Sequence, residues 1–79
     1  MAEYTLYIKE TCPFCVKVLR FMQSAGIELP QKSTLDPAIK AELTAIGGKP
    51  QVPCLVIDGK ALYESDDIIA YLKANFPAQ

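Results

Sequence analysis

Two cysteines in the segment CPFC, Cys12 and Cys15, stand between a run that favours a strand and a run that favours a helix. Residues 4–8, YTLYI, are aromatic and β-branched, which is typical of a strand. Pro13 suits the first position of a helix, and apolar residues then recur at helical spacing until Gly26, a natural stop. A strand that leads directly into a helix begins a βαβ unit, so this junction favours an α/β fold.

The rest of the chain continues the alternation, and its 79 residues predict a single domain over 1–79. We expect a weak edge strand in 27–33, a helix from Asp36-Pro37 to Gly47-Gly48, a strand over 52–57, a turn at Asp58-Gly59, a short strand near 60–63 and a last helix capped by Ser65. The order is β-α-β-α-β-β-α. With a parallel βαβ start and an antiparallel closing hairpin, it predicts a three-layer α/β fold around a four-stranded mixed sheet.

Composition excludes several classes of partner. Hydrophobic residues make up 51% of the chain and charged residues 22%, with a net charge of −1 and scattered Lys and Arg. Without a basic stripe we expect no nucleic acid and no membrane surface as partners. The first ten residues lack the features of a signal peptide, and no apolar run approaches the ~18 residues that span a bilayer. These features predict a soluble, cytoplasmic protein.

The chain has no histidine and three cysteines. The absence of histidine excludes Cys/His and Ser/His nucleophile pairs and histidine metal ligands. A structural zinc site usually takes four ligands, and only Cys54 could join the CPFC pair, so we expect no metal site. A purely structural disulfide is unusual in a reducing compartment. A CxxC pair at a strand-to-helix junction therefore predicts a redox role.

Cys12 has the surroundings of a reactive thiol. The thiolate is the nucleophile, and a helix N-terminus with nearby cations lowers a cysteine pKa. Cys12 lies at such an N-terminus, with Lys9 before it and Lys17 one turn later. Cys15, three residues on, lies deeper on the same helical face. An exposed attacking thiol with a sheltered resolving thiol suits thiol–disulfide exchange.

Cys54 is expected to be passive. It lies in the apolar run VPCLVI, where strand alternation turns it away from the side that Pro53 faces and toward that of Val52 and Val56. A buried free cysteine behaves as a small hydrophobe of low reactivity. The alternative is a third redox thiol that pairs with Cys12 or Cys15.

The segments KETCPFC, QVPCLVIDG and ESDDI together resemble the glutaredoxins, whose common active-site form is CPYC, over nearly the whole chain. VPCLVIDGKALYESDDIIAYL is also similar to the N-terminal, glutathione-binding half of the glutathione transferases. The resemblance implies a thioredoxin-like fold and a monomeric enzyme, a glutathione-disulfide oxidoreductase with glutathione as co-substrate. Its partners would be disulfide-containing or glutathionylated proteins, with Cys12 and Cys15 as catalytic residues.

The resemblance also implies a glutathione site. Val52 would offer its backbone to the cysteinyl part, and Pro53 would be a cis-proline facing the Cys12 sulfur, although the residues alone favour a trans proline that begins a strand. Ser65 and Asp66 would hold the γ-glutamyl end, which a helix N-terminus suits. The remaining implied contacts are Lys9 and Gln51 near the glycine carboxylate, Phe14 as an aromatic wall, and Glu64 of the transferase type.

Two departures from the family leave alternatives open. Tyr63-Glu64 stands where glutaredoxins usually carry Gly-Gly, which restricts the backbone. Gln51 stands where threonine is common.

One alternative is a [2Fe–2S] carrier in which Cys12 of two chains and two glutathiones hold the cluster, although Pro13 favours a resolving role for Cys15. The other is a transferase-like glutathione-binding module. The physiological reductant, glutathione or a thioredoxin reductase, is also open.

Overall fold

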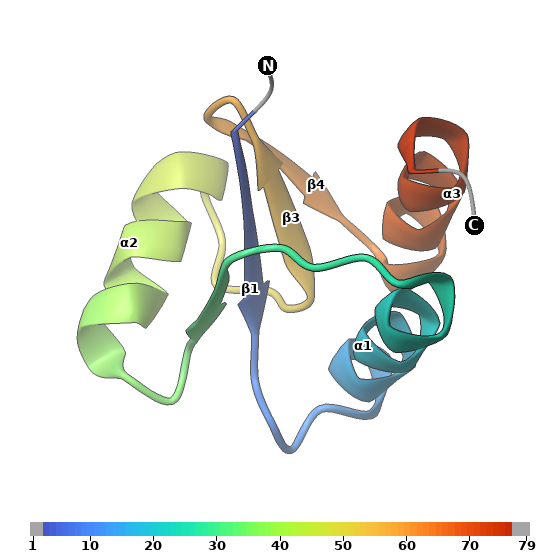
Figure 1. Ribbon diagram of the computed structural model, residues 1–79. Coiled ribbons are helices and arrows are strands. Elements are labelled where there is room, and N and C mark those ends of the chain that lie inside the picture. The colour runs from blue at the N-terminus through green and yellow to red at the C-terminus, as the bar shows by residue number, and fades with distance from the viewer. Residues whose placement is uncertain (1–2, 77–79) are drawn as a thin grey trace.

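Three helices cover the two faces of a four-stranded sheet in the computed structural model, which describes residues 3–76 (Figure 1). The elements follow the predicted order β-α-β-α-β-β-α. They are β1 (Tyr4–Ile8), α1 (Pro13–Ala25), β2 (Gln31–Ser33), α2 (Pro37–Gly47), β3 (Cys54–Ile57), β4 (Lys60–Tyr63) and α3 (Ser65–Asn75). Among the described residues, no helix combines the length and apolar character needed to cross a bilayer.

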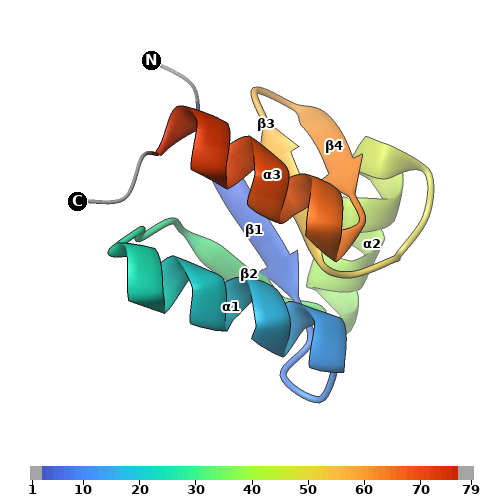
Figure 2. The same cartoon turned by 90° about the vertical axis from the view of Figure 1, so that its right-hand side faces the viewer.

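The sheet has the strand order β2-β1-β3-β4 and is mixed, as predicted. β1 pairs in parallel with β2 and antiparallel with β3, and β3 pairs antiparallel with β4. α2 lies on one face, and α1 and α3 lie side by side on the other, which gives three layers (Figures 1 and 2). β2 is a short edge strand that begins after Pro30, whose carbonyl oxygen accepts the N–H of Leu6 at 2.8 Å. Proline has no N–H to donate, so an edge suits it.

Strand alternation divides the core into two layers. Leu6 and its cross-strand partner Leu55 are fully buried under α1 and α3. Tyr7 and its partner Cys54 are buried on the opposite face, where they pack with Leu43 of α2. The second layer is the smaller of the two because a single helix covers that face.

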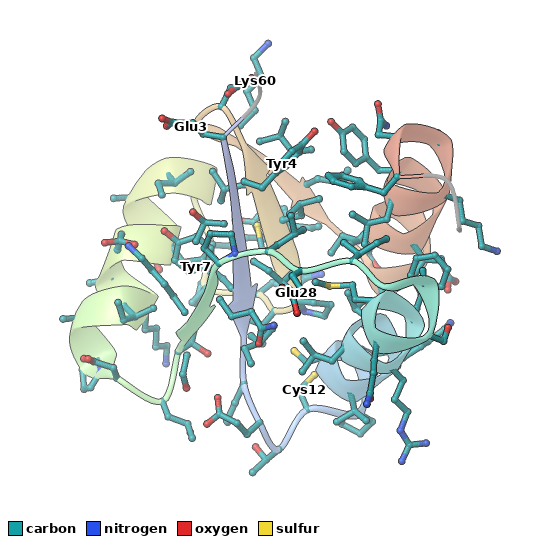
Figure 3. The ribbon with its side chains drawn as sticks, in the orientation of Figure 1. Glu3, Tyr4, Tyr7, Cys12, Glu28 and Lys60 are labelled. Carbon is teal, nitrogen blue, oxygen red and sulfur yellow. The ribbon has the colours of Figure 1, made fainter. Side chains whose placement is uncertain are left out.

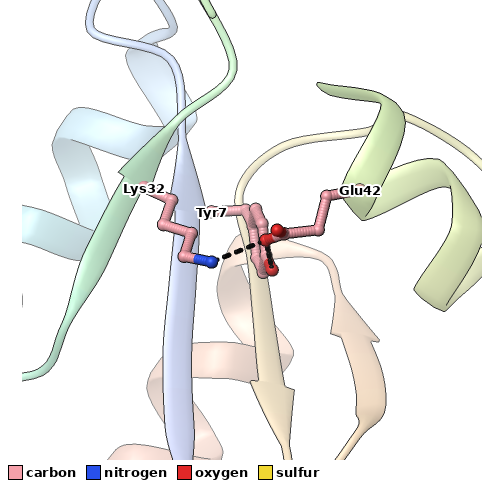
Figure 4. Close-up of polar contacts among 3 residues, drawn as sticks. All are labelled: Tyr7, Lys32 and Glu42. Atoms are coloured by element: carbon pink, nitrogen blue, oxygen red, sulfur yellow. Dashed lines mark hydrogen bonds and ion pairs between the residues drawn. The ribbon is translucent and has the colours of Figure 1, made fainter. Parts of the chain in front are cut away.

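A polar contact also joins α2 to the sheet (Figure 4). The Tyr7 hydroxyl donates to the Glu42 carboxylate, and Lys32 of β2 lies 2.8 Å from the same carboxylate oxygen. Burial, followed by this hydrogen bond, raises the pKa of Tyr7 to about 12. Lys32 and then Tyr7 hold the pKa of Glu42 below its ordinary value. One carboxylate therefore links β1, β2 and α2.

Local sequence signals set most of the element ends. Cys12 is the N-cap of α1, and Gly26 ends that helix with φ 72°. The Asp36 carboxylate accepts the N–H of Ala38 at 2.9 Å and caps α2. Asp58 and Gly59 both have positive φ in the turn between β3 and β4, which matches the predicted tight hairpin.

Three expectations need correction. Ser65 does not cap α3, because the N-cap is Glu64 and Ser65 is the first helical residue. The strand expected over 52–57 begins only at Cys54, since Val52 and Pro53 form a bend joined by a cis peptide bond. The edge strand expected in 27–33 covers only Gln31–Ser33, because Pro30 has no N–H to donate to a ladder.

Candidate active site

Cys12 lies at the start of α1, at the end of the molecule where β1 leads into the helix (Figure 3). Its Sγ is 4.0 Å from the carbonyl oxygen of Val52, forty positions later in the chain. The Val52–Pro53 peptide bond is cis, as the resemblance implied. The fold therefore places backbone hydrogen-bonding groups of the segment before β3 beside the sulfur of Cys12.

The electrostatics around Cys12 favour its thiolate. Burial opposes ionisation, but interactions with the backbone and side chain of Cys15 and with the backbone of Phe14 outweigh it. The positive charge of Lys9 acts in the same direction. The pKa of Cys12 consequently lies below its ordinary value, although its side chain makes no capping hydrogen bond of standard geometry. Free N–H groups of a first helical turn are the expected source of this effect.

Cys15 has the opposite environment. It is fully buried on the inner face of α1. Burial raises its pKa to about 11, although the N–H of Lys9 donates to its sulfur at 3.4 Å and favours ionisation. The two cysteines of CPFC thus differ as the sequence predicted, with one accessible thiol of lowered pKa and one sheltered thiol of raised pKa.

A pocket of about 330 Å³ adjoins Val52. This volume is within the ~300–1,000 Å³ typical of small-ligand sites. Seven of the eight residues expected around glutathione line it: Phe14, Gln51, Val52, Pro53, Glu64, Ser65 and Asp66. They come from α1, from the segment before β3 and from the start of α3, so the fold brings together residues that are far apart in the chain.

Side chains of this pocket already interact with one another and with α1. Gln51 donates through Nε2 to Glu64 Oε1 at 3.1 Å. Lys17 Nζ lies 2.5 Å from Asp66 Oδ1, with both side chains exposed. Lys17 was expected to act on Cys12, but its place in the second turn of α1 directs it to α3 instead. Exposed ion pairs contribute at most about 1 kcal/mol, so a ligand can displace Lys17 from Asp66 at little cost.

The backbone before α3 is strained. Glu64 has φ 71°, a conformation that residues other than glycine rarely adopt and that costs on the order of 1–3 kcal/mol. The chain thus keeps a left-handed residue at the position where the glutaredoxin pattern has glycine. This bend brings the largely buried Ser65 and the first N–H groups of α3 to the pocket.

A close approach between Gly47 and Tyr63 fixes the segment that carries Gln51 and Val52. The Tyr63 hydroxyl donates to the carbonyl oxygen of Lys49 at 2.9 Å. A Cβ on Gly47 would lie 1.8 Å from the Tyr63 oxygen, so only glycine leaves room for this arrangement. Gly47 therefore does more than end α2, which is the role that the sequence predicted for it.

Lys9 lies outside the pocket, in an adjacent groove that also borders Val52. The other residues of this groove come from the end of β2, from α2 and from the segment before β3: Thr34, Leu35, Pro37, Lys40 and Pro50. No spacing in the sequence indicates these residues, because only the packing of α2 against the sheet places them beside Lys9. Pro37 at the first position of α2 fixes the register of Lys40, but it does not indicate what the helix packs against.

Comparison with known proteins places this arrangement in a family. Residues 6–79 match the family model of the glutathione S-transferase N-terminal domain. Glutaredoxin 3 of Escherichia coli K12 is 32% identical over 72 residues, which cover 89% of this chain and 86% of the relative. The chain belongs to the thioredoxin-like family of glutaredoxins and transferase N-terminal domains. A probable glutaredoxin of Synechocystis sp. PCC 6803 is also 32% identical, over 87% of this chain and 81% of its own.

Solved structures of glutathione transferases share the fold. Glutathione transferase Omega 3C of Trametes versicolor superposes with a TM-score of 0.81 at 26% identity, over 95% of this chain. A glutathione S-transferase of the Antarctic clam Laternula elliptica gives 0.77 at 25% identity, also over 95%. This thioredoxin-like chain spans 34% and 36% of those two proteins, respectively. By length, it matches the glutaredoxins more fully.

Cys54 is the third thiol of this glutaredoxin-like domain. It is fully buried with Tyr7, Leu43 and Val56, which confirms the predicted burial and orientation. Burial raises its pKa to about 11. No group of three or more Cys, Asp or Glu side chains gathers into a potential metal site within residues 3–76. The passive role of Cys54 stays a prediction.

The three pKa directions predict an ordered thiol titration. Ultraviolet absorbance of the thiolate should show one group, Cys12, that ionises below the ordinary cysteine pKa. Cys15 and Cys54 should ionise only near pH 11. The low-pH step should disappear in Cys12→Ser and persist in Cys54→Ser. A Cys12 pKa at or above that of a free cysteine would contradict the activation described here.

Proposed function

We propose that the protein is a glutathione-dependent thiol–disulfide oxidoreductase that reduces protein disulfides and glutathione mixed disulfides. The observation that carries this proposal is the position of Cys12. Its sulfur lies at a helix N-terminus with a lowered pKa, beside Val52 and a pocket of suitable size. The named glutaredoxin relatives support the same class of activity.

The reaction begins with attack of the Cys12 thiolate on a disulfide sulfur. A bond forms between the two sulfurs, the substrate disulfide breaks, and the departing thiolate takes a proton from solvent. With a protein disulfide, Cys15 then attacks the Cys12 sulfur and releases the second substrate thiol. With a glutathione mixed disulfide, Cys12 retains the glutathione, and a free glutathione thiolate attacks the sulfur of that bound glutathione, which releases the Cys12 thiolate and glutathione disulfide. The two electrons come from the Cys12–Cys15 pair, which becomes a disulfide, or from glutathione. Two glutathione molecules regenerate the dithiol and leave as glutathione disulfide.

The pocket supplies groups for each part of glutathione. The Val52 backbone lies beside the position that the cysteinyl sulfur takes when it joins Cys12. The first N–H groups of α3 suit the γ-glutamyl α-carboxylate, and Asp66 suits the α-ammonium that replaces Lys17. Gln51 and Lys9 lie on the sides where the glycine carboxylate can extend. Phe14, 62% exposed, contributes an apolar wall at the rim.

A transferase-like role is the second candidate, because Glu64 precedes Ser65 as in the transferase pattern and both line the pocket. This role differs from disulfide reduction in the group that acts as the nucleophile. In such a module the glutathione sulfur attacks an electrophile, and neither Cys12 nor Cys15 takes part. Conjugation of glutathione to an aryl halide should therefore survive loss of both cysteines, whereas disulfide reduction should not.

A coupled assay tests the proposal. Glutathione, glutathione reductase and NADPH are mixed with a small glutathione mixed disulfide, and NADPH oxidation is followed with and without the protein. The expected result is a rate that requires both the protein and glutathione. A rate that stays at the background level with folded protein would contradict the proposal.

A further inference from the structure

The groove that contains Lys9 is a separate feature from the glutathione pocket. Its volume is about 460 Å³, and the two cavities share the single residue Val52, which lies beside the Cys12 sulfur. A chain attached to Cys12 can therefore continue on either side of Val52. One side leads to the N-terminus of α3, and the other runs along the start of α2.

The groove has a distinct chemical character. Two of its side chains are cations, Lys9 and Lys40, and no acidic side chain lines it. Within residues 3–76 neither lysine makes an ion pair. Asp36 lies between the groove residues Leu35 and Pro37 in the sequence. Its carboxylate does not pair with a lysine but accepts a hydrogen bond from the N–H of Ala38. The lining of the groove therefore carries two positive charges that no ion pair within residues 3–76 neutralises.

An apolar surface lies beside these charges. Leu35 is 55% exposed, one of three large hydrophobic side chains that are exposed among the described residues. It borders the groove together with Pro37 and Pro50. An exposed leucine between two prolines and two lysines suits a polypeptide that carries both acidic and apolar side chains, and it suits a bare anion less well.

We propose that this groove binds the segment of a protein substrate that follows its reacting cysteine, and that it favours acidic residues there. The inference rests on the proposed function. In that function the γ-glutamyl end of glutathione extends to α3 and the glycine end extends to Lys9. A substrate cysteine joined to Cys12 in the same direction sends its following residues past Lys9 toward Leu35 and Lys40.

Three peptide disulfides test the proposal. They are symmetric dimers of one short peptide in which the two residues after the cysteine are Glu-Glu, Gln-Gln or Lys-Lys. In the coupled assay at low salt, kcat/KM should fall in that order, by about two- to fivefold at each step, the size that exposed ion pairs support. Raising the salt concentration should bring the three values together.

Variants of groove residues test whether the groove causes these differences in kcat/KM. Lys40→Glu should lower kcat/KM for the Glu-Glu peptide about fivefold or more and raise it for the Lys-Lys peptide, with no change for a small glutathione mixed disulfide. The matched control is Lys60→Glu, since Lys60 lies at the opposite end of the molecule from Cys12 (Figure 3). Leu35→Ser should lower kcat/KM for all three peptides and leave the small substrate unaffected.

The outcomes separate this proposal from the proposed function. If wild-type protein fails to reduce the small mixed disulfide, the proposed function itself is wrong. If it reduces that substrate but treats the three peptides alike, or if Lys40→Glu acts no differently from Lys60→Glu, the groove proposal is wrong. An equal effect of Lys40→Glu on the small substrate would also overturn it, because Lys40 would then belong to the glutathione site.

Discussion

Replacement of Cys12 by serine is expected to reduce disulfide and mixed-disulfide reduction to the uncatalysed background. Of the three thiols, only Cys12 combines access with a lowered pKa, and a serine hydroxyl does not ionise at neutral pH. Cys15→Ser is expected to keep reduction of a glutathione mixed disulfide within about threefold, because that reaction needs one protein thiol and external glutathione. The coupled assay measures both variants.

Cys54→Ser is the matched control for these two substitutions. It removes a thiol of equal size that faces α2 and should leave both activities close to those of the wild-type protein. Equal loss of both activities in Cys15→Ser would contradict the division into an attacking and a resolving thiol. Activity that survives in Cys12→Ser would favour the transferase-like role.

Leu55→Ala is expected to have the largest effect on stability. Leu55 is fully buried in β3, one of the two central strands, in the same cluster as Leu6, Cys15 and Ile68. Truncation of a buried leucine lowers the free energy of unfolding by about 2–5 kcal/mol. The free energy of unfolding of natural domains is about 0.05–0.15 kcal/mol per residue. The loss is therefore a large share of the total free energy of unfolding expected for 79 residues. The midpoint of urea unfolding measures it.

Leu35→Ala controls for the chemistry of the substitution. Leu35 is 55% exposed, so the same truncation should change the free energy of unfolding by no more than about 0.5 kcal/mol. Equal shifts of the two urea midpoints would show that the core is not where the structure places it. The comparison also confirms that Leu35 can be varied in substrate experiments without loss of the fold.

Features of the fold that depend on neighbouring residues could be predicted from the sequence. Pro13 and Gly26 bound α1, Asp36 caps α2, and Asp58-Gly59 forms the hairpin turn, each through its own backbone or side-chain preference. Period-two alternation predicts that Cys54 points away from the side of Pro53, and its burial against α2 agrees. The contrast between Cys12 and Cys15 is also a local property, since it follows from their positions at the start and on the inner face of α1.

Features that depend on contacts between distant elements could not be predicted in this way. Ser65 has the ordinary preference of an N-cap, but it is the first residue of α3, and the N-cap is Glu64, which has a positive φ in the bend before the helix. Lys17 pairs with Asp66 only because α1 and α3 lie side by side. Only the family resemblance groups the residues expected around glutathione, since no spacing in the sequence brings Gln51 to Glu64.

The proposed mechanism requires that Cys12 form a mixed disulfide with glutathione while the pocket holds the rest of the tripeptide. Its most direct test is mass spectrometry of Cys15→Ser after incubation with glutathione disulfide, followed by peptide mapping. Without the resolving thiol, one glutathione should remain on Cys12, and Cys54 should stay unmodified in the folded protein. Modification of Cys54 instead, or no adduct on Cys12, would contradict the claim.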